Sequence, residues 1–142
     1  MFDFVKNGEN KIYPVSEEDI LDAERELNLS FPFELREFYK NIGYVFLSGS
    51  KSHINRIMDP SSVCSFRLRE YEYEDDPAAE SYDEFEDGKL VFFEVDSDVL
   101  FSIELTDEKK SKIYYYDTKI ADSLEDFLIK MSENIMYYND II

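Results

Sequence analysis

Three apolar stretches in the second half of the chain restrict the fold more than any other feature of the sequence. Leu90–Val95, Val99–Leu105 and Lys112–Tyr116 are rich in β-branched and aromatic residues, and polar turns separate them. Runs of this kind are typical of strands, and short connections join strands that run in opposite directions. The sequence therefore predicts an antiparallel meander after Gly88.

Two helical patterns precede these strands. Ser16 is followed by three acidic residues. This is the form of a capped helix start, because the hydroxyl can accept from a free N–H and the acids suit the positive end of the helix dipole. We expect this helix over 16–28. Pro32 suits the first turn of a second helix, expected over 33–42 and ended by Gly43.

A third helix is expected at the C-terminal end, over 123–136. Asp122 or Ser123 can cap it, and apolar residues then recur on one face at helical spacing. The remaining expected elements are short strands at Tyr44–Leu47 and His53–Met58, and a helix that starts at 59–62 and runs towards Leu68. The residues expected in the core are Ile20, Leu27, Leu35, Phe38, Phe92, Phe101, Tyr115, Phe127, Leu128 and Met131.

The charge balance is strongly acidic. Asp and Glu total 33 against 15 Lys and Arg, which gives a net charge of −18. Such a chain repels nucleic acid and anionic membranes and attracts basic partners at long range. We therefore predict a protein partner, with no nucleic acid and no membrane. The alternative is that the acidity only keeps the protein in solution.

More than half of this charge lies in one stretch, residues 70–87, which contains ten acidic and no basic residues. If Arg69–Glu74 is extended, its three glutamates point to one face and its two tyrosines to the other. The glutamates would then be spaced by about 6.5–7 Å, much as phosphates repeat along a nucleic acid. The alternative is a solvated acidic loop around Pro77.

Nothing in the sequence predicts catalysis, a metal or a cofactor. Cys64 is the one cysteine and is expected in the core, whereas His53 is the one histidine and is expected at the surface. Neither residue has the sequence context of an activated nucleophile or base. The chain has only 4 glycines, and they form no Gly-rich phosphate-binding loop. Asp96 and Asp98 could hold a hard cation, but this spacing is usually turn chemistry.

The N-terminus has neither a basic start nor a sustained apolar run, so we expect no signal peptide. No stretch has the roughly 20 apolar residues that cross a bilayer. The expected location is therefore cytoplasmic.

Two stretches carry motifs of a known family. Residues 15–43 read VSEEDILDAERELNLSFPFELREFYKNIG, and residues 112–131 read KIYYYDTKIADSLEDFLIKM. The first has an acidic helix start, a leucine-rich first helix, a Pro break and a helix that ends in the spacing Tyr/Phe-x-x-x-x-Gly. The second has a strand followed by a capped helix, with Leu124 where Phe is usual. Together they resemble the SUKH superfamily, the Smi/Knr-type family. The usual Trp and Asn-Gly after the second helix are missing, and the usual Gly-rich loop reads Glu94–Asp98.

The resemblance implies a single α+β domain over 1–142, with a central antiparallel sheet flanked by the N-terminal helices and a C-terminal helix. It also implies no catalysis. Many bacterial members are immunity proteins encoded beside secreted polymorphic toxins, often nucleases. The leading hypothesis is an immunity protein, or antitoxin, that binds a basic nuclease toxin domain and blocks its groove. Eukaryotic relatives are regulatory scaffolds, so a non-catalytic regulatory or scaffold module is the alternative.

Under the leading hypothesis, the acidic stretch meets the basic toxin domain. The predicted partner-binding residues are Glu70, Tyr71, Glu72, Tyr73, Glu74, Asp75, Asp76, Tyr82, Asp83, Glu84, Glu86 and Asp87, with Asp96 and Asp98 as a weaker second candidate.

Overall fold

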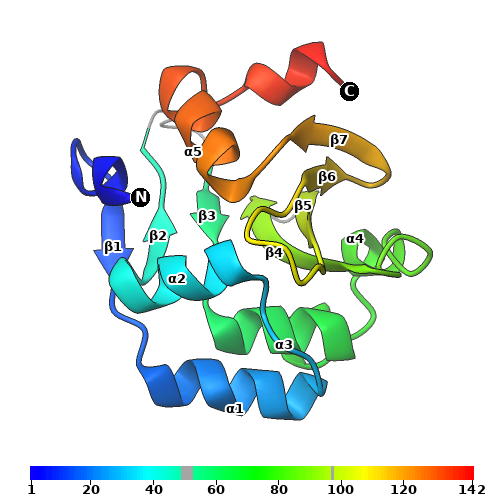
Figure 1. The fold of residues 1–142 in the computed structure, drawn as a ribbon. Helices are drawn as coiled ribbons and strands as arrows, with labels where there is room; N and C mark the ends of the chain where they lie inside the picture. The colour runs from blue at the N-terminus through cyan, green and yellow to red at the C-terminus, as the bar shows by residue number, and fades with distance from the viewer. Residues whose placement is uncertain (49–52, 97) are drawn as a thin grey trace.

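A computed structural model describes residues 1–48, 53–96 and 98–142, which contain one seven-stranded sheet (Figure 1). The strands follow one another across the sheet in chain order, and each runs antiparallel to its neighbours. They are β1 (Lys11–Tyr13), β2 (Tyr44–Phe46), β3 (Asn55–Ile57), β4 (Lys89–Val95), β5 (Val99–Glu104), β6 (Ile113–Tyr115) and β7 (Thr118–Ala121). The predicted meander is confirmed as β4–β6, and the sheet extends beyond it on both sides.

The described residues also form five α-helices and three short 3-10 helices. These are α1 (Glu17–Leu27), α2 (Phe33–Asn41), α3 (Pro60–Leu68), α4 (Pro77–Glu80) and α5 (Leu124–Glu133), with η1 (Asp3–Lys6), η2 (Tyr71–Tyr73) and η3 (Tyr137–Asp140). The helices predicted over 16–28, 33–42 and 123–136 correspond to α1, α2 and α5, with ends that differ by at most three residues, and the helix expected from 59–62 towards Leu68 corresponds to α3. The α+β fold class is therefore confirmed. The sequence analysis did not predict β1 or β7 as separate strands.

Local chemistry explains where the helices begin. The Ser16 hydroxyl accepts from Asp19 N at 3.1 Å, and the Asp19 carboxylate accepts from Ser16 N, which completes a capping box. Ser123 accepts from Asp126 N at 3.0 Å at the start of α5. Figure 1 shows α1 and α3 side by side beneath the strands, and the two helices are in contact.

Gly43 sets how closely β1 approaches β2. Its φ is +120°, and a Cβ at this position would lie 2.0 Å from the carbonyl oxygen of Tyr13. Tyr13 is the register partner of Tyr44, the residue that follows Gly43. The glycine that comes after α2 therefore also makes room for the edge of the sheet.

One face of the sheet carries the main aromatic core. Phe93 and Phe101 are register partners whose rings stack with centroids 5.6 Å apart, and Phe127 of α5 meets both rings edge-on. Helix α2 packs against α5. Among the predicted core residues, Ile20, Leu35, Phe38, Phe92, Phe101, Phe127, Leu128 and Met131 are buried, whereas Leu27 and Tyr115 are only partly buried.

The opposite face carries Tyr13, Tyr44, Phe46, Arg56 and Glu94. Tyr13 is the register partner of Tyr44, and Phe46 follows Tyr44 by two positions on β2, so both point to the same face. Arg56 is the register partner of both Phe46 and Glu94. Over β4, Tyr73 brings residues 70–87 to this face, since its hydroxyl is 3.4 Å from Oε2 of Glu94. The face therefore has an aromatic half on β1 and β2 and an acidic half over β4.

Candidate partner-binding surface

The acidic segment, defined as residues 70–87, is folded rather than extended. Tyr71–Tyr73 form the 3-10 turn η2, and Pro77–Glu80 form α4. The extended arrangement of Arg69–Glu74, which the sequence analysis considered as one possibility, does not form. In an extended strand Tyr71 and Tyr73 would share a face, but here Tyr71 is 77% exposed and Tyr73 is buried. The difference arises because a 3-10 turn rotates successive side chains by about 120° rather than 180°.

Buried aromatic side chains anchor the segment. The ring of Tyr73 meets Phe66 of α3, and the ring of Tyr82 stacks on Tyr116 with centroids 4.3 Å apart. The Tyr82 hydroxyl donates to the carbonyl oxygen of Leu100. Burial raises the pKa of both phenols. The rings of Tyr73 and Tyr82, which the sequence analysis included among the partner-binding residues, thus lie in the core, and Tyr71 is the exposed tyrosine of the segment.

Two arginines hold the C-terminal part of the segment. Arg69 Nη2 lies 2.9 Å from Asp83 Oδ1 and 2.8 Å from Glu86 Oε1, and Arg67 lies 3.9 Å from the other oxygen of Glu86. Burial raises the pKa of Glu86, although both arginines act in the opposite direction. Asp76 caps α4 by accepting from its backbone at 3.1 Å. Three predicted partner-binding acids therefore also stabilise the segment itself.

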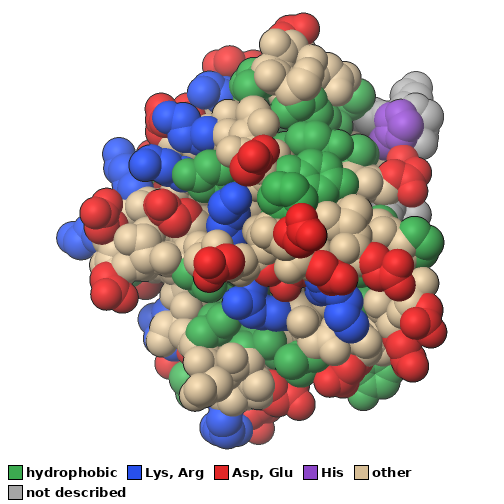
Figure 2. Space-filling view, turned by 90° about the vertical axis from the view of Figure 1, so that its right-hand side faces the viewer, with side chains coloured by type: hydrophobic (Ala, Val, Ile, Leu, Met, Phe, Trp, Pro, Cys, Tyr) green, Lys and Arg blue, Asp and Glu red, His purple; other side chains and the backbone are tan. Residues whose placement is uncertain are grey.

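The other acids of the segment point to solvent. They are Glu70, Glu72, Glu74, Asp75, Glu80, Glu84 and Asp87, of which Glu80 was not among the predicted residues. Figure 2 looks at the side of the molecule where α4 lies and shows Asp and Glu side chains spread across this surface, with fewer Lys and Arg between them. The buried anchors and the exposed carboxylates together make a preformed acidic surface.

The second candidate pair lies at the turn between β4 and β5. The Asp96 carboxylate accepts from Ile54 N at 2.8 Å and lies 2.6 Å from Nδ1 of His53. The backbone bond from Ile54, followed by the contact with His53, lowers the pKa of Asp96. Asp98 is exposed. Asp96 therefore ties the turn to the residues before β3, while Asp98 lies at the surface.

The described residues hold no group of three or more His, Cys, Asp or Glu side chains that could bind a metal ion. Cys64 is buried, as predicted, and burial raises the pKa of its thiol to about 11. A thiol in this state carries almost no nucleophilic thiolate near neutral pH. His53 is exposed, also as predicted.

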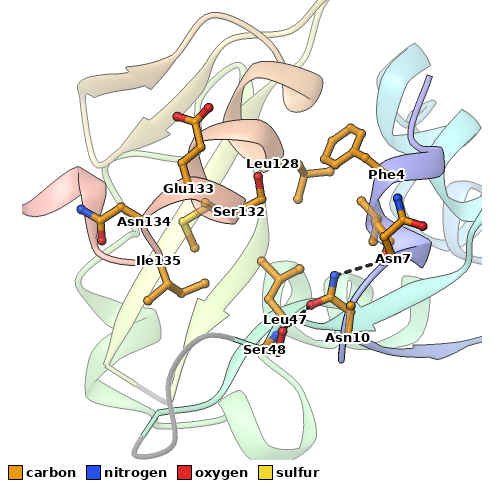
Figure 3. Close-up of a pocket in the computed structure, with 13 residues that line it drawn as sticks. Phe4, Asn7, Asn10, Leu47, Ser48, Leu128, Ser132, Glu133, Asn134 and Ile135 are labelled. Carbon is orange, nitrogen blue, oxygen red and sulfur yellow. Dashed lines mark hydrogen bonds between the residues drawn. The ribbon is translucent and has the colours of Figure 1, made fainter.

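A cavity of about 450 Å³ lies between η1 and the C-terminal end of α5 (Figure 3). Phe4, Leu47, Leu128 and Ile135 supply apolar walls, and among its lining residues only Glu133 is titratable. A lone carboxylate has no partner for acid–base chemistry here. The cavity therefore offers no catalytic arrangement among the described residues.

Among the residues that the structure describes, no helix combines the length and the apolar character that a bilayer crossing requires.

The family model described as SMI1-KNR4 cell-wall, of the SUKH group, matches residues 17–128, so the chain belongs to this family. The chain is 50% identical over 142 residues to the immunity protein YxxD of Bacillus subtilis (strain 168), which covers 99% of this chain and 97% of the relative. No solved structure matches the chain.

These two matches confirm the predicted membership of the SUKH superfamily and its immunity-protein branch. They also confirm the prediction of a family without catalytic activity. The acidic segment lies wholly within residues 17–128, the stretch that the family model matches.

Proposed function

We propose that this chain is an immunity protein that acts in the cytoplasm as one domain over 1–142, binding a basic toxin domain and blocking its substrate groove. The similarity to YxxD over nearly the full length of both chains supports the immunity role. The single structural observation that carries the mechanism is the acidic segment, in which most carboxylates are exposed while Tyr73 and Tyr82 are anchored in the core.

A preformed acidic surface favours a basic groove in two ways. It raises the association rate by electrostatic steering, by about 10–10³ at low salt. It also avoids the cost of ordering a loop on binding, because Tyr73 and Tyr82 already hold the segment in place. A nuclease fits this description, since its groove must attract a polyanion.

The first experiment tests protection. The toxin encoded beside the gene is expressed in a host cell with and without this chain, and survival is measured. We expect the chain to restore growth. A regulatory or scaffold module would bind some other protein and would leave the toxin active, so toxicity that persists at equal expression would contradict the immunity role.

The second experiment tests the acidic segment. Glu72, Glu74 and Glu84 are exposed, and none of them forms an ion pair within the described part of the chain. Changing all three to Lys should slow association with the toxin domain by about tenfold or more at low salt, and should weaken its salt dependence. Stopped-flow rates at two salt concentrations measure this. Asp83 is left unchanged because it pairs with Arg69.

The matched control is Glu18→Lys, Glu108→Lys and Glu133→Lys, which makes the same change in net charge at exposed sites on other elements. Its association rate should fall less. Equal slowing in both variants would show that total charge, rather than the acidic segment, steers the encounter. Circular dichroism confirms that both variants are folded.

A further inference from the structure

The aromatic half of the second sheet face contains a stack of rings at the edge of the sheet. Tyr13 of β1 and Tyr44 of β2 are stacked, with centroids 5.2 Å apart and planes 21° apart. Phe46 meets both rings edge-on, at 5.8 Å and 6.2 Å. Tyr13 is 43% exposed. Because strand pairing fixes these rings, they would lose little side-chain entropy on contact with a partner.

An acid-lined hollow adjoins this stack. Tyr44 lines a depression of about 350 Å³ between α1 and the start of α3. Besides Tyr44 and Cys64, its titratable lining groups are four acids, without any Lys or Arg; the acids are Asp19, Asp22, Glu26 and Asp59. An aromatic ring beside carboxylates is the setting that a Lys or Arg side chain prefers, because the stem packs on the ring and the head group meets the charge.

The same surface already contains one cation packed on a ring. The Arg56 guanidinium lies 5.9 Å from the centroid of Phe46, and it pairs with Glu94 at 2.5 Å and Asp59 at 3.5 Å. Glu94 in turn contacts the hydroxyl of Tyr73. This chain of contacts makes the aromatic stack continuous with the acidic segment on one face of the sheet.

We propose that the Tyr13–Tyr44 stack is the apolar centre of the toxin-binding surface. A Lys or Arg side chain of the basic toxin domain lies across the rings and directs its charge into the acid-lined hollow. The inference rests on the proposed immunity function and names the surface on which that function depends. Interfaces of this kind place a few aromatic side chains at the centre and charged groups around them, and the aromatic residues carry most of the binding energy.

The test uses the full chain and a catalytically inactive form of the toxin domain encoded beside the gene. Tyr13→Ala should raise the Kd by about tenfold or more, mainly through faster dissociation, because the central contact is lost while the steering charges remain. Tyr13→Phe keeps the ring and should bind within about threefold of the unchanged chain. Phe33→Ala is the matched control. Phe33 is an aromatic residue of similar exposure, 40%, but it lies on a different element, at the start of α2, which packs against α5.

A second variant keeps the test decisive if Tyr13→Ala does not fold. Glu26→Lys leaves the rings intact and places a positive charge in the hollow, so it should also weaken binding by about tenfold or more. If the wild-type chain binds and Tyr13→Ala binds with unchanged affinity, this inference is overturned while the proposed function stands. If Tyr13→Ala does not fold, unchanged affinity in Glu26→Lys has the same consequence. Equal loss in Phe33→Ala would overturn it as well. Absence of binding and protection by the wild-type chain would overturn the proposed function and this inference together.

Discussion

At the scale of single residues, Glu34 shows how one buried carboxylate joins distant parts of the chain. It lies in the first turn of α2 and is only 2% exposed. Its carboxylate accepts from Leu124 N at 3.0 Å, Glu125 N at 3.2 Å and Ser111 N at 3.2 Å. The positive end of the α5 dipole stabilises the negative charge, and the charge satisfies backbone donors that a helix start leaves free.

We expect Glu34→Gln to lower the free energy of unfolding by about 2–3 kcal/mol. The amide keeps only one acceptor oxygen, so its NH2 group would face backbone N–H donors that are left unsatisfied. Urea denaturation measures the loss. Glu37→Gln in the same helix is the control and should change stability by less than about 0.5 kcal/mol, because the Glu37 carboxylate accepts from Asn41 in an exposed setting. Equal midpoints for the two variants would contradict this role of Glu34.

At the scale of elements, α5 is held by its apolar face. Phe127 is fully buried, and its ring meets Phe92, Phe93 and Phe101 with centroids 5.2–6.0 Å apart. Apolar residues at helical spacing predicted this face from the sequence. The helix therefore depends on one aromatic cluster at the centre of the sheet.

Phe127→Ala should reduce the free energy of unfolding by about 3–5 kcal/mol, because it removes a large ring and leaves a cavity among three others. Chemical denaturation followed by far-UV circular dichroism measures this. Ile129→Ala lies on the same helix, where Ile129 is 41% exposed, and it should cost about 1 kcal/mol or less. A loss below about 1 kcal/mol for Phe127→Ala would refute the assignment of Phe127 to the core.

At the scale of the whole molecule, the net charge of −18 acts on stability as well as on binding. Acidic residues outnumber basic ones by 33 to 15, so repulsion between like charges outweighs the attraction of the surface ion pairs. Salt screens exposed charges over about 10 Å at 0.1 M.

We therefore expect the melting temperature to rise as NaCl is increased from roughly 0.02 to roughly 0.3 M, by about 4 °C for each ~1 kcal/mol gained. Differential scanning calorimetry measures the shift. The variant with Glu72, Glu74 and Glu84 changed to Lys is less acidic and should show a smaller rise. A melting temperature that falls with salt would mean that attractive pairs dominate in the folded chain.

Elements whose signals are local could be predicted from the amino-acid sequence. Capping at Ser16 and Ser123, the apolar period of α5 and the polar turns between β4, β5 and β6 each depend on neighbours within a few positions, so they could be predicted without a structure. The family resemblance rested on the same local motifs, and the family match confirms it.

Features that depend on contacts between residues far apart in the chain could be seen only in the folded structure. Strands β1 and β7 are three and four residues long, too short for an apolar period, and are strands because a neighbouring strand supplies their hydrogen bonds. The acidic segment turns inward at Tyr73 and Tyr82 because the sheet and α3 offer those rings an apolar surface. Tyr13 meets Tyr44 only because Gly43 lets two strands approach, a contact that no local pattern records.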